Sequence, residues 1–141
     1  MRIEELENVL AVEIGVEAES SPELVVELAQ AARGELPVIL QLPLHRSLEL
    51  ADKITEAGAA ALSLGAPRGA LPGPNGKVIA GRLYGPALFP QALETVRELV
   101  KTQLPIIAAG GVESTAQGEA MLATGATAVQ MDVALWKISA I

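Results

Sequence analysis

Short apolar runs alternate with stretches of helical periodicity along most of the chain. The apolar runs have the length of buried strands, and in the stretches between them apolar positions recur every three or four residues. This pattern predicts five strands, over residues 9–16, 36–42, 60–64, 105–109 and 127–131, with four helices between them, over about 22–33, 47–58, 86–101 and 114–125. Strict alternation of strand and helix is typical of a parallel sheet with right-handed crossovers.

Local signals support the helix starts. Ser20-Ser21-Pro22-Glu23 places a serine before a proline, which fits the first helical position. We expect Ser47 to cap the second helix, and Ser114 or Thr115 to cap the fourth. The segment 65–85 breaks the regularity because it is rich in Gly and Pro. At about 20 residues it is long enough for a functional loop or lid.

The length of the chain limits the architecture. A complete (β/α)₈ barrel needs about 250 residues, whereas this chain has 141. We therefore expect an α/β fold in a single domain over residues 1–141, either an open parallel sheet or part of a barrel.

Composition excludes several functional classes. The chain has no Cys and one His, so we expect no disulfide, no metal site and no cysteine nucleophile. Its net charge of −7 argues against nucleic acid and anionic membrane surfaces as partners. No apolar run approaches the length of a membrane span, and the acidic N-terminus lacks a signal-peptide pattern. The cytoplasm is the expected location.

The stretch Leu104-Pro-Ile-Ile-Ala-Ala-Gly-Gly-Val112 carries the first candidate for chemistry. It predicts a buried strand that runs into a Gly-Gly turn and then into the N-terminus of the fourth helix. Glycines let backbone N–H groups approach an anion, and a helix N-terminus adds positive partial charge. A phosphate is expected at Gly110 and Gly111, unless the pair only forms a tight turn. A β-branched residue at Gly111 would block the approach of the backbone.

Several motifs together resemble the dihydroorotate dehydrogenase family. The segment Gly81-Arg-Leu-Tyr-Gly-Pro-Ala-Leu-Phe-Pro90 is similar to that family's Gly-Leu-Ser-Gly-Pro-Ala-Ile-Lys-Pro. The Gly-Gly strand is similar to its Ile-Pro-Ile-Ile-Gly-x-Gly-Gly-Ile/Val, and Gly125-Ala-Thr-Ala-Val-Gln130 to its Gly-Ala-Ser-Ala-Val-Gln. Residues 37–42 and 56–59 match two further segments, Pro-Val-x-Val-Lys-Leu and Glu-Ala-Gly-Ala. The order and spacing of these motifs cover nearly the whole chain.

The resemblance implies a partial, half TIM barrel in which five parallel strands alternate with four helices. These would be strands four to eight of a flavin-binding (β/α)₈ barrel. It implies an oxidoreductase of pyrimidine biosynthesis that uses flavin mononucleotide (FMN). The cofactor-binding positions carried over from the family are Gln41, Gly85, Gly110, Gly111, Asp132 and Val133.

Departures from the family fall on the reactive positions. The base that removes a proton from dihydroorotate is replaced by Ala18, with Gly15 at the preceding Asn position. The Lys that contacts the flavin is replaced by Gln41, and the serine of Gly-Leu-Ser-Gly by Tyr84. The Asp132 carboxylate would oppose a phosphate. We therefore assign no catalytic residue and expect this chain alone to be inactive. The alternative is a non-catalytic half-barrel module that binds a phosphate-bearing ligand or a partner chain.

Other side chains allow a functional or a structural interpretation. His45 could be catalytic or contact an anion with Arg46, or be an ordinary loop residue. Arg68 and Lys77 could close over an anionic ligand or be ordinary loop charges. The pair Arg82 and Tyr84 could bind a ligand, contact a partner or pack. Glu13 and Asp132, at opposite edges of the expected sheet, are candidates for displaced acid–base chemistry, and Ser20 or Ser21 could replace the base or cap the helix. Trp136, with Leu135 and Ile138, is expected to cap the core or an interface.

Half a barrel has two exposed sheet edges, and we expect an inner face lined with Val, Ile and Leu. Such surfaces favour association. We therefore expect a homo-oligomer, most simply a homodimer, that buries about 1,500 Å² or more. Alternatively, the 65–85 loop folds across the inner face as a plug.

Overall fold

The computed structural model describes residues 8–131 and 134–135. Five strands form one parallel sheet, and they lie in it in the order in which they follow along the chain. The strands are β1 (Val12–Gly15), β2 (Val38–Pro43), β3 (Ala61–Gly65), β6 (Ile106–Ala108) and β7 (Ala128–Val129). Because right-handed crossovers in such an order put every helix on one side, this is half of a (β/α)₈ barrel, as predicted, rather than a doubly wound sheet.

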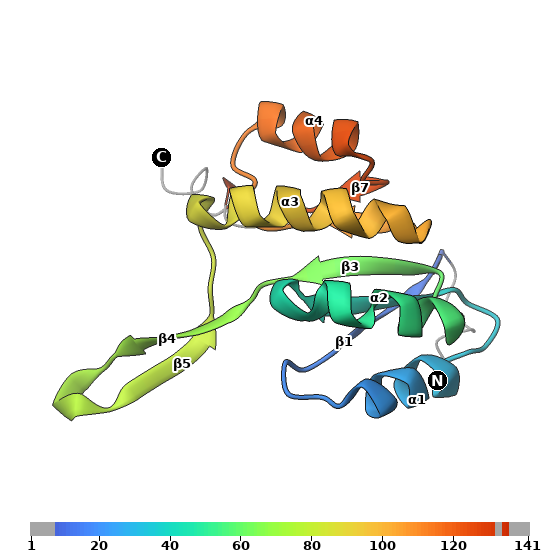
Figure 1. Cartoon of the computed structure of the whole chain (residues 1–141), viewed down its shortest axis with the longest axis horizontal. Helices are drawn as coiled ribbons and strands as arrows, with labels where there is room; N and C mark the ends of the chain where they lie inside the picture. The colour runs from blue at the N-terminus through green and yellow to red at the C-terminus, as the bar shows by residue number, and fades with distance from the viewer. Residues whose placement is uncertain (1–7, 132–133, 136–141) are drawn as a thin grey trace.

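Four α-helices connect these strands, in the predicted positions (Figure 1). They are α1 (Pro22–Ala31), α2 (Ser47–Glu56), α3 (Phe89–Leu99) and α4 (Thr115–Thr124). Short 3-10 turns at Pro86–Leu88 and Val100–Thr102 extend α3 to the expected length. The Ser21 hydroxyl accepts a hydrogen bond from the Leu24 amide and so caps α1, and Ser114 caps α4 in the same way through Gln117.

The expectation that Ser47 caps the second helix is wrong. Arg46 occupies the N-cap position, and Ser47 is the first residue of α2. The 3-10 turn Leu44–Arg46 leads directly into the helix, so the Ser47 hydroxyl donates back to the Leu44 carbonyl at 2.9 Å. Ser47 is completely buried there, and its hydroxyl satisfies a backbone group in the turn before the helix.

The hydrophobic core lies between the sheet and the helices. Leu40 and Leu62 from neighbouring strands are completely buried, as are Ile54 of α2 and Val96 of α3. At about 25 cal/mol per Å² of apolar area, burial of such aliphatic side chains is the main stabilising contribution available to a chain with few aromatic residues.

The opposite face of the sheet is not the apolar surface expected from the sequence. The register places Gly15, Gln41, Ser63, Ile107 and Ala128 in one row across it, so only one member of that row is a large aliphatic residue. A carboxylate at the sheet edge also takes part. The Glu13 Oε1 atom accepts hydrogen bonds from the Ser63 hydroxyl and from Gln41 Nε2. The expected lining of Val, Ile and Leu is therefore wrong, because the helix side of each strand takes most of those residues.

The segment 65–85 forms an antiparallel hairpin rather than a loop. Strands β4 (Arg68–Pro72) and β5 (Val78–Arg82) pair along their length and project away from the sheet and helices (Figure 1). Their side chains are mostly exposed, including Leu71 and Ile79. The alternative in which this segment folds over the inner face as a plug is therefore also wrong. The expectations for Trp136 and Ile138 concern positions outside the described residues, and Leu135 is exposed.

We predict that Leu62→Ala lowers the free energy of unfolding by about 2–5 kcal/mol, because the substitution leaves a cavity in the centre of the core. Leu10→Ala is the matched control. It removes the same atoms from a side chain that is 85% exposed and lies outside the hairpin, and we expect a change within about 0.5 kcal/mol. Urea unfolding followed by circular dichroism measures both values. Equal losses in the two variants would contradict the position of the core.

Candidate functional site

The candidate site lies at the carboxyl ends of the parallel strands, where two hollows adjoin. The first hollow has a volume of about 230 Å³, and its lining includes Gly15, Ala18, Gln41, Gly65, Arg68 and Arg82. The second hollow, of about 70 Å³, is lined by residues that include Gln41, Gly65, Arg82, Tyr84, Gly110, Gly111 and Gln130. Gln41, Gly65 and Arg82 are common to both, so the two hollows form one continuous surface. Carboxyl ends of barrel strands are where TIM-barrel enzymes place their active sites.

Gln41 occupies the centre of this surface. It is a β2 residue paired in register with Gly15 on one side and Ser63 on the other. Its amide nitrogen donates to Glu13 at 3.4 Å, a long hydrogen bond. The carbonyl end of the amide remains available for a donor on a ligand. Gln41 is therefore positioned to contact a ligand in either hollow, without the positive charge of a lysine.

The predicted Gly-Gly turn forms, and it lies at the second hollow. Gly110 and Gly111 have φ angles of 118° and 69°, in the region that favours glycine. Among the hydrogen bonds between described residues, none uses the amide of either glycine. These amides are thus available to an anion, as a phosphate-binding turn requires.

Packing also requires glycine at position 111. A Cβ there would lie 2.5 Å from the Phe89 nitrogen and 2.8 Å from the Gly85 carbonyl oxygen. Gly85, another predicted site residue, therefore lies against this turn without lining either hollow. A β-branched residue at Gly111 would displace the N-terminus of α3, so its loss of binding would not by itself identify an anion site.

Helix α4 begins beside this turn with a reciprocal cap. The Ser114 hydroxyl accepts from the Gln117 amide at 3.3 Å, while Gln117 Oε1 accepts from the Glu113 amide at 2.8 Å. This capping box occupies two of the donors that an anion would otherwise meet at the helix end. Sequence reasoning identified Ser114 but missed Gln117, although a Ser followed three residues later by Gln is its recognised signal.

Arg46 anchors the loop between β1 and α1, which forms one wall of the first hollow. Its guanidinium donates to the carbonyl oxygens of Ala18 and Ser20, and to both carboxylate oxygens of Glu49. The hydrogen bonds from Arg46 hold the pKa of Glu49 below its ordinary value, and they raise the pKa of Arg46. The loop thereby has a fixed position, and sequence reasoning missed this structural role of Arg46.

Several predicted residues do not reach the site. His45 is exposed and lines neither hollow, and Lys77 follows the hairpin turn between β4 and β5. Ser21 serves as a helix cap. Asp132 and Val133 lie outside the described residues. Glu13 lines neither hollow, but it holds Gln41 from the inner face of the sheet.

The described residues contain no group of three or more His, Cys, Asp or Glu side chains that could hold a metal ion. Within the same residues, no helix has the length and apolar character needed to cross a membrane.

Glycine at position 111 has a proposed role in anion binding and a role in close packing on α3, and a stability measurement tests the packing alone. We predict that Gly111→Ala lowers the free energy of unfolding by about 2 kcal/mol or more, since the methyl group meets backbone atoms as well as an unfavourable φ angle. Gly76→Ala is the control, because Gly76 has a similar φ of 72° and no atom within 4 Å of the added Cβ. Thermal or urea unfolding measures both. A Gly111→Ala loss no larger than that of Gly76→Ala would contradict the close packing of the turn on α3.

Comparison with known proteins identifies the same family as the sequence motifs. The family model for dihydroorotate dehydrogenase matches residues 72–140. The catalytic subunits of dihydroorotate dehydrogenase B (NAD⁺) from two strains of Streptococcus pneumoniae are 44% and 42% identical over 55 residues. Each of these matches covers 38% of this chain and 18% of the relative.

The half-barrel fold is also found within solved structures. Two crystal structures of DHODH from Eimeria tenella, one in complex with ferulenol and one free of ligand, superpose with TM-scores of 0.58 and 0.60. Both are 19% identical in sequence to this chain, cover 72% and 74% of it, and are themselves covered over 30% and 32% of their length. The chain thus spans less than a third of the length of these relatives. By the sequence match over residues 72–140, this part of the chain belongs to the dihydroorotate dehydrogenase family.

Proposed function

We propose that this chain forms one wall of a flavin-binding site and binds FMN through its phosphate, without turning over substrate by itself. The observation that supports this most strongly is that the amides of Gly110 and Gly111, which line the second hollow with Arg82, have no hydrogen-bond partner among the described residues. Backbone amides and a guanidinium are donors that suit a phosphate. When bound, FMN supplies the acceptor for a hydride, and the residues of this chain bind and orient it.

The size of the hollows supports a single wall rather than a complete site. Pockets that enclose small ligands measure about 300–1,000 Å³. The two hollows measure about 230 and 70 Å³ and are partly open to solvent. FMN held by its phosphate at Gly110 and Gly111 would extend across Gln41, and further βα units would have to cover its other side. In this proposal the complete oxidoreductase of pyrimidine biosynthesis requires those units.

The chemistry of the first hollow supports inactivity of the chain alone. A general base must lie within hydrogen-bond reach of the proton it removes. At the place where the family resemblance puts the base, Ala18 has no titratable group, and its carbonyl is bonded to Arg46. Glu17 is the one carboxylate among the residues that line this hollow. The non-catalytic half-barrel module that binds a phosphate-bearing ligand therefore stays the alternative, and a cytoplasmic location stays a prediction.

We predict that the protein binds FMN at least about tenfold more tightly than riboflavin, which has the same ring system but lacks the phosphate. Quenching of flavin fluorescence on titration with protein measures both affinities. Equal affinities would contradict the phosphate-binding turn, and no binding of either flavin would contradict the proposed cofactor. Dihydroorotate added to the FMN complex should leave the flavin absorbance unchanged. Bleaching would show that the chain alone is active.

We also propose that two copies of this chain associate through the hairpin rather than through the inner face of the sheet. Leu71, Val78 and Ile79 are 67%, 71% and 59% exposed on the hairpin. Charge favours an acidic partner surface, because the segment 66–85 contains three basic residues and no acidic one. The rest of the chain, with seven basic and 17 acidic residues, carries a net charge of −10. A second copy supplies such a surface.

Light scattering tests this association. We expect a mass that rises toward that of a dimer at micromolar concentration and returns to the monomer in Ile79→Glu, since a carboxylate removes apolar contact and lowers the positive charge of the hairpin. Leu10→Glu is the control, at a side chain 85% exposed and outside the hairpin. A monomer mass independent of concentration would contradict a homodimer, and equal dissociation in both variants would contradict the role of the hairpin.

A further inference from the structure

Two arginines face each other across the base of the hairpin. Arg68 of β4 is the direct cross-strand partner of Arg82 of β5, so both side chains emerge on the same face. Directly opposed residues of an antiparallel pair have Cβ atoms about 4.5–5.5 Å apart, and like charges in this position destabilise the pair. A hairpin gains nothing in stability from two arginines placed in this way.

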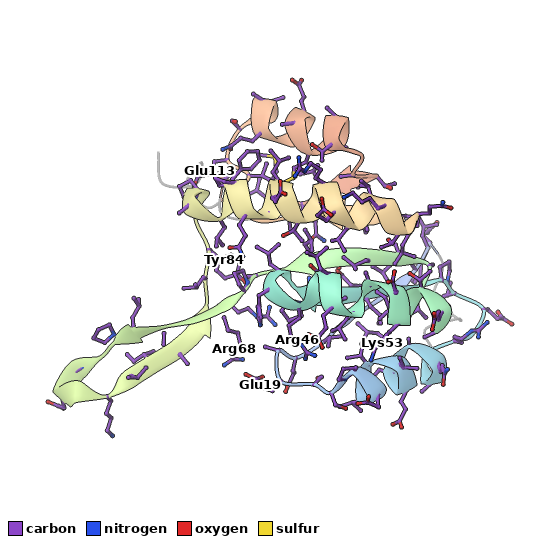
Figure 2. The ribbon with its side chains drawn as sticks, in the orientation of Figure 1. Glu19, Arg46, Lys53, Arg68, Tyr84 and Glu113 are labelled. Atoms are coloured by element: carbon purple, nitrogen blue, oxygen red, sulfur yellow. The ribbon has the colours of Figure 1, made fainter. Side chains whose placement is uncertain are left out.

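Neither arginine is well neutralised by the described part of the protein. Arg68 Nε lies 3.9 Å from Glu19 Oε1, and both side chains are largely exposed, at 49% and 73%. Such a pair contributes little. Among residues 8–131 and 134–135, no carboxylate forms a salt bridge with Arg82. Figure 2 shows Arg68, Glu19 and Arg46 close together where the hairpin leaves the sheet. Arg46 already donates a hydrogen bond to the Glu49 carboxylate.

Both arginines also line the first hollow, at the carboxyl ends of the parallel strands. The polar groups around that hollow are two guanidinium groups, the Gln41 amide and the Glu17 carboxylate. The balance of charge is positive in a protein whose net charge is negative. A guanidinium presents N–H donors in a planar fork that matches a carboxylate or phosphate group, and two of them can hold both sides of one oxyanion.

We propose that Arg68 and Arg82 form a clamp for an oxyanion, a carboxylate or phosphate group, of a ligand in the first hollow. This ligand is separate from the phosphate assigned to the Gly-Gly turn. The position of this ligand beside a cofactor rests on the proposed function, because Arg82 also lines the second hollow with Gly110 and Gly111. Arg68 lines only the first hollow. The two hollows thus provide for a phosphate-bearing cofactor and an anionic second ligand side by side.

Binding of simple oxyanions tests the clamp. Benzoate and inorganic phosphate are titrated separately into the ¹⁵N-labelled protein at low ionic strength, and affinity is read from the amide shifts of Gly65, Ala66, Arg68 and Arg82. We expect one or both probes to bind, and Arg68→Gln and Arg82→Gln each to weaken binding about tenfold or more. Lys77→Gln, which removes the same charge from the same hairpin away from the hollows, should change affinity less than about twofold. The probe that binds more tightly identifies the class of oxyanion.

Stability without ligand provides a second readout. Because Arg68→Gln relieves a like-charge pair, its melting temperature in an oxyanion-free buffer should equal or exceed that of the original protein. Added probe should then raise the melting temperature of the original protein more than that of the variant. The clamp is wrong if neither probe binds, if Lys77→Gln weakens binding as much as Arg68→Gln, or if Arg68→Gln unfolds at a clearly lower temperature.

The two proposals fail in different ways. FMN affinity should be nearly unchanged in Arg68→Gln, because Arg68 does not line the second hollow. Loss of FMN binding together with benzoate binding would mean that the cofactor occupies the clamp, which overturns the separate second ligand. Benzoate or phosphate binding that depends on Arg68, in a protein that does not bind FMN, would support the clamp and contradict the proposed cofactor.

Discussion

The parallel register of β2 with β3 is the constraint on which the rest of the structure depends. Pairing Leu40 with Leu62 and Gln41 with Ser63 sends aliphatic side chains to the helices and polar ones to the opposite face. Because side chains alternate along a strand, a shift of one residue would exchange the two faces. The register therefore determines both where the core lies and that Gln41 reaches the site.

The same constraint explains how half a barrel tolerates an open inner face. In the row that crosses the sheet, Ser63 and Gln41 donate hydrogen bonds to Glu13 on the edge strand. A charged residue that points inward from an edge strand is also a means of discouraging edge-to-edge pairing. The sheet is therefore covered by helices on one side and carries a satisfied polar network on the other.

Periodicity was sufficient to predict the sheet and its helices, since the strands are short aliphatic runs and Ser21, Ser114 and Gly125 act at helix ends through local backbone geometry. The hairpin was missed because β4 and β5 are rich in Gly, Ala and Pro and lack a clear alternation. A usable signal was present in Asn75-Gly76, which lies between the apolar pairs Ala70-Leu71 and Val78-Ile79, because this dipeptide is common in hairpin turns. At the site, the motifs located Gln41 and the Gly-Gly turn. The close approach of Gly111 to Gly85 and the pairing of Arg68 with Arg82 depend on long-range packing, which no local pattern contains.

The closed base of the hairpin has a consequence for how such a protein changes over time. The Leu83 amide donates to the Pro67 carbonyl at 2.8 Å, so the chain leaves the barrel and re-enters it at almost the same point. Residues added or removed beyond that bond would leave the spacing between β3 and α3 unaltered, and a longer excursion costs little extra closure entropy. The hairpin is thus a segment whose length and sequence can differ between relatives while the half-barrel stays constant. Its base remains fixed over the ligand surface, and its tip is free to diverge.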